Sequence, residues 1–205
     1  MKRKPLLAVI ALVLVSACTH RVAIALRPDF NAKLQRGHEL PKMTPPLKFF
    51  RGNYTDKRQD PTLLATFKQG VNTYNLQEQR PMGDAIFEGL AAAITASGHQ
   101  WNEAKDGDVR VDATFVNLQA ARNAGFVMVG ATTAIQVKLD FVDAKTGNLI
   151  FSNIYSGTDK REKAMLGLMG MVKDSVDASI VNCIQSVVDD AELTKSLLKA
   201  KGGFN

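Results

Sequence analysis

The chain contains very few of the residues that cross-link a fold or bind metal. Its 205 residues include two cysteines, three histidines and one tryptophan. The histidines, at positions 20, 38 and 99, show no metal-ligand spacing with each other or with Cys183. We therefore expect no metal site and no cofactor.

The sequence motifs of common enzyme classes are also missing. Ser156-Gly157 lacks the Gly-x-Ser-x-Gly elbow of serine hydrolases. Gly167 and Gly170 fall short of a dinucleotide or phosphate-binding loop. The neighbouring acids Asp189 and Asp190 are expected to cap a helix rather than to form a hydrolytic pair. The sequence thus predicts no catalytic or cofactor-binding residues and a protein that is not an enzyme.

No apolar run reaches the roughly 20 residues with which a helix spans a bilayer. The run from Leu6 to Val15 follows three basic residues, Lys2 to Lys4, and precedes the small residues Ser16 and Ala17. A basic start, a short apolar run and small residues at its end are typical of a secretory signal peptide. Residues 1–17 are therefore predicted to be a signal peptide that is cleaved between Ala17 and Cys18.

The segment Val15-Ser16-Ala17-Cys18 resembles the lipobox of bacterial lipoproteins. The resemblance implies that the Cys18 thiol is diacylated and that its new amine is acylated after cleavage. Three acyl chains hold a protein on a membrane, because each buried methylene contributes about 0.8 kcal/mol. In such lipoproteins an aspartate after the cysteine favours the inner membrane, whereas here the residue is Thr19. The resemblance therefore implies an outer-membrane anchor, with the domain facing the periplasm. The alternative is a plain signal peptide with an incidental cysteine.

The positive charge of the chain is concentrated in the signal peptide. Removing residues 1–17 takes away three basic residues and no acidic ones, so the formal net charge falls from +6 to +3. The remaining charges are intermixed, without a face of clustered lysine and arginine among aromatic residues. This pattern excludes nucleic acid as the expected partner.

Prolines and glycines interrupt the segment that follows Cys18, at positions 28, 37, 41, 45 and 46. Apart from a candidate short strand at 22–26, residues 18–46 are predicted to be a flexible, lipidated tether. One folded domain is expected over residues 47–199, with a disordered tail at 200–205.

The domain combines two kinds of apolar periodicity. Residues 47–51, 109–115, 135–141 and 148–156 are predicted strands, most of them with alternating apolar and polar residues. A hairpin turn is expected at 143–147, with Gly147 at positive φ. Residues 67–76 are a weaker strand candidate, and 54–65 are interpreted as a polar loop. A helix is expected from Pro81 to Ser97, because apolar residues recur there every three or four positions.

The C-terminal part is predicted to hold a long helix through Val187 and a shorter one capped by Asp190. Cys183 lies on the apolar stripe of the long helix, so a core position is expected. Before that helix, Met165, Leu166, Leu168 and Met169 form either a partner-binding patch, if exposed, or its first turns folded onto the sheet. The sequence favours the second interpretation. The fold class that follows is α+β, a two-layer domain with helices packed on one face of a mainly antiparallel sheet.

This order of elements behind a lipobox resembles the YajG-type family of bacterial envelope lipoproteins. The matching segments are residues 47–58, 83–86, 109–118 and 172–176, whereas the long linker and residues 119–131 depart from the pattern. The resemblance implies a fold and a location rather than an activity. We expect a non-catalytic module that binds an envelope protein of unknown identity or assists assembly. The alternatives are a cell-envelope hydrolase and a self-associating structural lipoprotein, which would pair through an open sheet edge or through residues 164–171.

Overall fold

The computed structural model describes residues 18–30, 34, 40–69, 71–124, 128–164 and 168–202. Its helices are α2 (Met82–Ala96), α3 (Leu168–Val188) and α4 (Ala191–Lys201). Its strands are β1 (Thr19–Ile24), β2 (Lys48–Asp56), β3 (Leu63–Gln69), β4 (Asn72–Glu78), β5 (Gln100–Asn102), β6 (Val109–Ala124), β7 (Met128–Asp143) and β8 (Leu149–Ala164). No helix in these ranges is long and apolar enough to cross a membrane.

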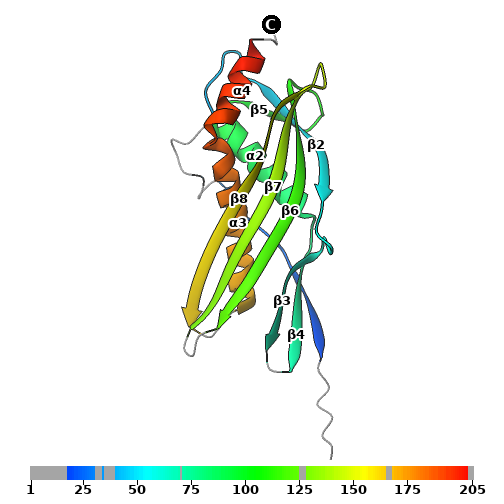
Figure 1. The fold of residues 1–205 in the computed structure, drawn as a ribbon, viewed down its shortest axis with the longest axis vertical. Coiled ribbons are helices and arrows are strands. Elements are labelled where there is room, and N and C mark those ends of the chain that lie inside the picture. Colours follow the sequence, from blue (N-terminus) through cyan, green and yellow to red (C-terminus); the bar gives the residue numbers. More distant parts are fainter. Residues whose placement is uncertain are drawn as a thin grey trace, which may run out of the picture.

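The larger sheet has five strands in the order β5-β2-β6-β7-β8. The ladders β6–β7 and β7–β8 are antiparallel and extend over almost the full length of three 16-residue strands. The shorter β2 is parallel to both β5 and β6. These long curved strands run along most of the molecule (Figure 1).

A smaller sheet of three strands, β1-β4-β3, lies at one end of the molecule (Figure 1). β3 and β4 form an antiparallel hairpin, and β1 adds to β4 in parallel, with Thr19 opposite Thr73. α4 and β5 lie at the opposite end of the molecule, as does the C-terminus (Figure 1). For brevity we call the two ends the small-sheet end and the α4 end.

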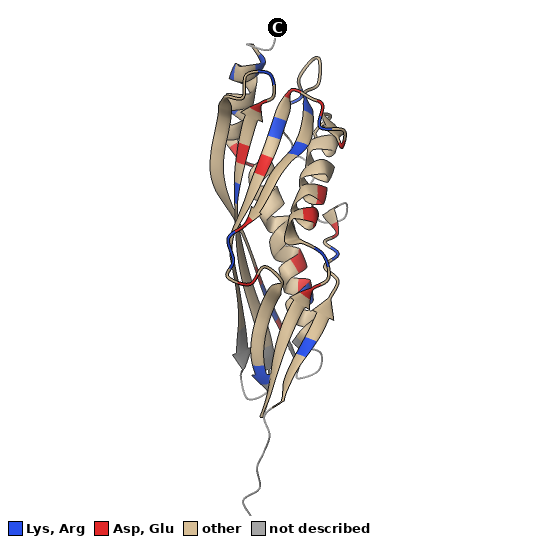
Figure 2. Cartoon of the chain, turned by 90° about the vertical axis from the view of Figure 1, so that its right-hand side faces the viewer, with Lys and Arg blue, Asp and Glu red and all other residues tan. Residues whose placement is uncertain are grey.

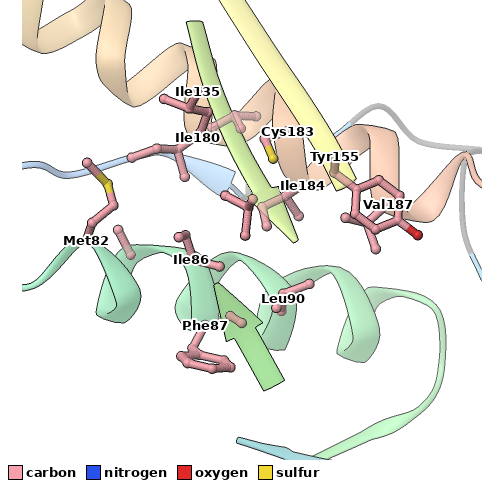
Figure 3. Close-up of a cluster of buried hydrophobic side chains, with 14 of the residues drawn as sticks. Met82, Ile86, Phe87, Leu90, Ile135, Tyr155, Ile180, Cys183, Ile184 and Val187 are labelled. Carbon is pink, nitrogen blue, oxygen red and sulfur yellow. The ribbon is translucent and has the colours of Figure 1, made fainter. Parts of the chain in front are cut away.

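The helices cover one face of the larger sheet. α3 packs on β7 and β8, and α2 packs on α3 and on the strands near β2. Between them lie fully buried side chains, among them Ile86, Leu90, Ile135, Ile180 and Ile184, which point toward one another (Figure 3). The fold class is thus α+β, as predicted, although β1, β2 and β5 add parallel pairings to the antiparallel ladders.

Three local predictions from the sequence are confirmed. α2 begins after Pro81 and ends before Gly98, whose φ is +81°. The turn between β7 and β8 contains Gly147 with a φ of +72°. Asp190 caps α4, because its side chain accepts hydrogen bonds from the backbone N–H groups of Glu192 and Leu193. Helix ends, turns and helix caps depend on a few neighbouring residues, so the sequence alone was sufficient to predict them.

The prediction of a flexible tether is corrected for the described residues between 18 and 46. Residues 19–24 form β1, and Leu26, Phe30 and Leu40 are buried in the core. The Arg27 backbone N–H donates to Asp177 of α3 over 3.0 Å. Proline and mixed charge suggested a solvated linker, but five widely spaced apolar side chains in this segment, Ile24, Leu26, Phe30, Leu40 and Met43, are enough to bind it to the domain.

Strand boundaries differ from the prediction in two places. Residues 54–65 are not one loop, because β2 continues to Asp56 and β3 begins at Leu63. Gly52 and Asn53, which follow the predicted strand 47–51, lie in an irregularity of the β2–β6 ladder. Residues 119–124 and 128–131, which departed from the family pattern, extend β6 and β7.

Candidate functional site

Cys18, the predicted acylation site, lies directly at the start of β1. The residue is exposed, and its backbone carbonyl accepts a hydrogen bond of 2.9 Å from the Thr73 N–H of β4. The anchor position is therefore joined to a paired strand without an intervening linker. Whether Cys18 is acylated, and whether the chain is cut after Ala17, stay predictions.

The second cysteine has a different environment. Cys183 is 2% exposed and lies in the core between α3 and β8, near Tyr155 (Figure 3). Burial raises the pKa of its thiol from 9.0 to about 12. A thiol in that state is inert at neutral pH, so the predicted core role of Cys183 is confirmed.

The proposed patch at residues 165–169 is only partly covered by the described chain. Met165 and Leu166 lie outside the described residues. Leu168 begins α3, and Met169 is half-buried against the core. Met169 thus fits the interpretation as a first helical turn, while the partner patch as a whole stays a prediction.

His99 lies between α2 and β5 and is a buried structural residue. It is 4% exposed, and its Nδ1 accepts from the Leu47 N–H at 3.3 Å while Nε2 lies 3.1 Å from the Pro41 carbonyl oxygen. Desolvation lowers the pKa of this imidazole below its usual value. The two ring nitrogens contact residues 47 and 41, so His99 stabilises the packing of that segment on the domain. In the described part of the chain no group of three or more His, Cys, Asp and Glu residues could hold a metal ion.

The structure also reveals a cluster of buried charges that sequence reasoning missed. The Arg58 guanidinium lies between Asp56 at the end of β2 and Glu78 at the end of β4, with N–O distances of 2.7 and 3.2 Å. The three side chains are only 7%, 10% and 6% exposed, respectively. Arg58 also stacks on the Phe115 ring at 4.7 Å and donates to the Leu63 carbonyl. We call Asp56, Arg58 and Glu78 the charged joint, because it links the strands of both sheets.

The two carboxylates of the charged joint have opposite pKa shifts. Hydrogen bonds and charge from Arg58 outweigh burial at Asp56 and lower its pKa. Burial dominates at Glu78 and raises its pKa from 4.5 to about 6. Tyr54 donates to Asp56 over 3.1 Å, and the desolvation of its phenol raises its pKa far above 10. Two acids with separated pKa values are a feature of acid–base sites and also of structural ion pairs.

A cavity of about 250 Å³ adjoins the charged joint. Its lining residues are Tyr54, Asp56, Pro61, Thr62, Glu78, Gln79, Arg80 and Pro81. Glu78 Oε1 accepts from Arg58 and from the Met82 N–H at the start of α2. Glu78 Oε2 and Arg80 Nε are buried and have no hydrogen-bond partner among the residues that the structure describes. Because Glu78 Oε2 is inaccessible, a ligand in this cavity cannot reach it unless the joint opens.

The sequence offered only a weak signal for the charged joint. Asp56 and Arg58 are two residues apart in a segment interpreted as a loop, and Glu78 is twenty residues further on. Only the pairing of β2 with β6 and of β3 with β4 brings these side chains together. The only indication in the sequence was that these three charged residues lie near the ends of predicted strands.

Comparison with known proteins points to a single family. A family model described as uncharacterized lipoprotein matches residues 53–197, and no curated protein matches the chain. The resemblance to the YajG-type lipoproteins, predicted from the sequence, is confirmed by this match.

Solved structures with this fold are distant in sequence. A crystal structure of a protein from Xanthomonas campestris is 11% identical, covering 87% of this chain and 99% of its own, with a TM-score of 0.55. A minor lipoprotein from Acinetobacter baumannii is 10% identical over 72% of this chain and 94% of its own, with a TM-score of 0.44. At 11% identity, the similarity to the Xanthomonas campestris structure shows the fold alone.

Proposed function

Because the chain belongs to the family described as uncharacterized lipoprotein, we propose that it is an outer-membrane lipoprotein, acylated at Cys18, that acts without catalysis by binding another envelope protein. The observation that carries the proposal is the position of Cys18, which is exposed at the first residue of the folded domain. A signal peptide that ends at this point would leave the domain intact. Thr19 favours the outer membrane, as argued above, and the periplasm is the compartment that the domain would face.

The binding role rests on the open edge of the larger sheet. β8 is the last strand in its order, and in the described ranges no strand pairs with its outer edge. Near its start Leu149 is 59% exposed and Ile154 is 52% exposed, while charged residues occupy 159–163. A sheet edge without a partner strand, beside exposed apolar side chains, is a template for an incoming strand. The Ile154 N–H donates to the Asn153 side chain over 2.8 Å, so an incoming strand would have to displace that hydrogen bond. We propose that a partner protein pairs with β8 over residues 149–156.

Cross-linking in intact envelopes tests both parts of this proposal. The proteins to compare are the wild type, Cys18→Ser, Ile154→Lys and, as a matched control, Leu198→Lys, since Leu198 is a similarly exposed apolar residue on α4. We expect the wild type and Leu198→Lys to fractionate with the outer membrane and to give the same cross-linked partner. Ile154→Lys should remain in the membrane and lose the partner, because a charge on an edge strand opposes pairing.

Three results would contradict the proposal in different ways. Fractionation of Cys18→Ser with the outer membrane to the same extent as the wild type would exclude the lipid anchor. Loss of the partner in Leu198→Lys as strongly as in Ile154→Lys would exclude β8 as the binding edge. A cross-linked product with the mass of two copies of this chain would replace the partner protein with self-association.

A hydrolase is the second candidate, since a cavity lies beside two acids with separated pKa values. Arg58 already engages both carboxylates, an arrangement that favours a structural role. Incubating the protein with purified cell-wall sacculi and with phospholipid vesicles decides between the two. Release of soluble products by the wild type, but not by a folded Glu78→Gln variant, would establish the hydrolase.

A further inference from the structure

The position of Cys18 determines which part of the surface lies next to an attached lipid. Thr19 pairs with Thr73, so Cys18 lies level with Asn72 at the start of β4. Neighbouring strands are about 4.8 Å apart. The turn that joins β3 to β4 is therefore the nearest surface to Cys18, and its residue Val71 is an apolar side chain that is 55% exposed.

Three stacked rings cross the first rows of the small sheet; the His20 ring is exposed, whereas Phe67 is buried in the core. The rings of His20, Tyr74 and Phe67 form a ladder across β1, β4 and β3, with centroid distances of 5.0 and 5.4 Å. Tyr74 is partly buried and packs against the core. These rings pack against one another and the core, so contact with lipid at this end depends on the exposed side chains around them. Because a strand rises about 3.3 Å per residue, this row lies within about 10 Å of Cys18.

The charge of the small sheet has one sign near Cys18. Lys68 lies opposite Thr73, in the row of Thr19, and Arg21 follows two residues along β1; both side chains are exposed. The three strands contain one acidic residue, Glu78, which is buried at the far end of β4. Blue bands mark the small-sheet end in Figure 2. Basic side chains near a bilayer are attracted to anionic headgroups.

We propose that the small-sheet end, through Val71, Lys68 and Arg21, rests in the headgroup layer of the bilayer that holds Cys18, so that the domain stands on the membrane with its α4 end pointing away. The headgroup layer is about 6 Å deep on each side of the hydrocarbon. Because β1 begins directly after the acylated residue, the first residues of the small sheet must lie within that layer. This inference rests on the proposed acylation of Cys18 and adds a fixed orientation to it.

Tryptophan quenching by brominated phospholipids tests the orientation. The chain has a single tryptophan, Trp101 in β5, on the part of the molecule that lies toward the α4 end (Figure 1). In a Trp101→Phe background, Val71→Trp and the matched control Leu198→Trp each place one tryptophan at an exposed apolar position. The proteins are purified from membranes and reconstituted in vesicles of anionic phospholipid brominated high on the acyl chains, after circular dichroism has verified their fold.

We expect the tryptophan at position 71 to lose severalfold more emission than the tryptophan at 198, while native Trp101 in the unsubstituted chain stays unquenched. Equal quenching at 71 and 198 in protein that sediments with the vesicles would overturn the orientation while leaving the anchor in place. Protein that does not sediment with the vesicles would instead contradict the acylation of Cys18. A blue-shifted but unquenched emission at 71 would show that protein, not lipid, covers this end.

Discussion

Around α2 and α3 the larger sheet is covered by apolar side chains, whereas the junction between β2, β3 and β4 is built around three buried charges. In the first region most buried side chains are apolar and contribute by their buried area, and the buried hydroxyls of Thr133, Ser175 and Ser179 hydrogen-bond to one another. The second depends on Arg58, which supplies the only charge that balances Asp56 and Glu78 within the joint. The difference teaches which loss should destabilise each region: lost side-chain volume in the apolar region and lost charge balance in the charged joint.

Removing the arginine of the charged joint should have the largest effect. We expect Arg58→Met to lower the free energy of unfolding by about 3–5 kcal/mol, because it leaves two buried carboxylates without a cation. The control is Arg110→Met, since Arg110 forms a partly exposed pair with Asp112 and should cost less than about 1 kcal/mol. Urea unfolding followed by circular dichroism measures both, and equal values would show that the joint is not a stabilising element.

Truncation in the apolar region provides the counterpart. Ile184 is 1% exposed, and Ile184→Ala should cost about 2–5 kcal/mol through lost burial and a residual cavity. The same substitution at exposed Ile154 should change stability by no more than about 0.5 kcal/mol. Urea unfolding checks the pair. If Ile154→Ala were as destabilising as Ile184→Ala, the outer face of β8 would have to be covered rather than open.

The charged joint should also produce a pH dependence that the apolar region lacks. The pKa of Glu78 is raised by burial from 4.5 to about 6, so the folded state binds the proton more tightly than the unfolded state. This contribution is fully present below pH 4.5 and is lost as the pH rises to about 6, a decrease of about 2 kcal/mol.

The Glu78→Gln variant isolates that contribution. The difference in unfolding free energy between wild type and variant should change across pH 4.5–6.5, with the wild type losing stability as the pH rises. Chemical unfolding at several pH values measures it. A difference that is constant with pH, or that changes in the opposite direction, would contradict a raised pKa for Glu78 in the folded state.

The smallest expected effect concerns the link between α3 and α4. Asp190 caps α4 and also accepts from the Tyr155 hydroxyl at 2.9 Å, so Asp190→Ala should cost about 1–2 kcal/mol. The neighbouring Asp189 is exposed and takes no part in this cap, and Asp189→Ala should cost less than about 0.5 kcal/mol. Thermal unfolding can rank the two, and the reverse order would contradict the capping role.

The same comparison explains what the sequence could predict. Helix α2 and the cores of β6, β7 and β8 follow a periodicity that neighbouring residues determine, so their existence and type were predictable. β1 was assigned to a tether, because its partner β4 lies some fifty residues away and its own apolar pattern is short. The charged joint was missed for the same reason, since long-range strand pairing alone brings Arg58 to Glu78. Cys18 could be proposed as the acylation site from the sequence alone, because a processing signal is a short run of neighbouring residues.

Intact mass spectrometry of the protein extracted from membranes tests the central claim, that Cys18 is the acylated first residue of the mature domain. The account predicts a mass that lacks residues 1–17 and gains three acyl chains and a glycerol, with Cys18→Ser remaining unprocessed. A wild-type mass equal to the full chain, or to a chain cut before Cys18 that carries no lipid, would contradict it.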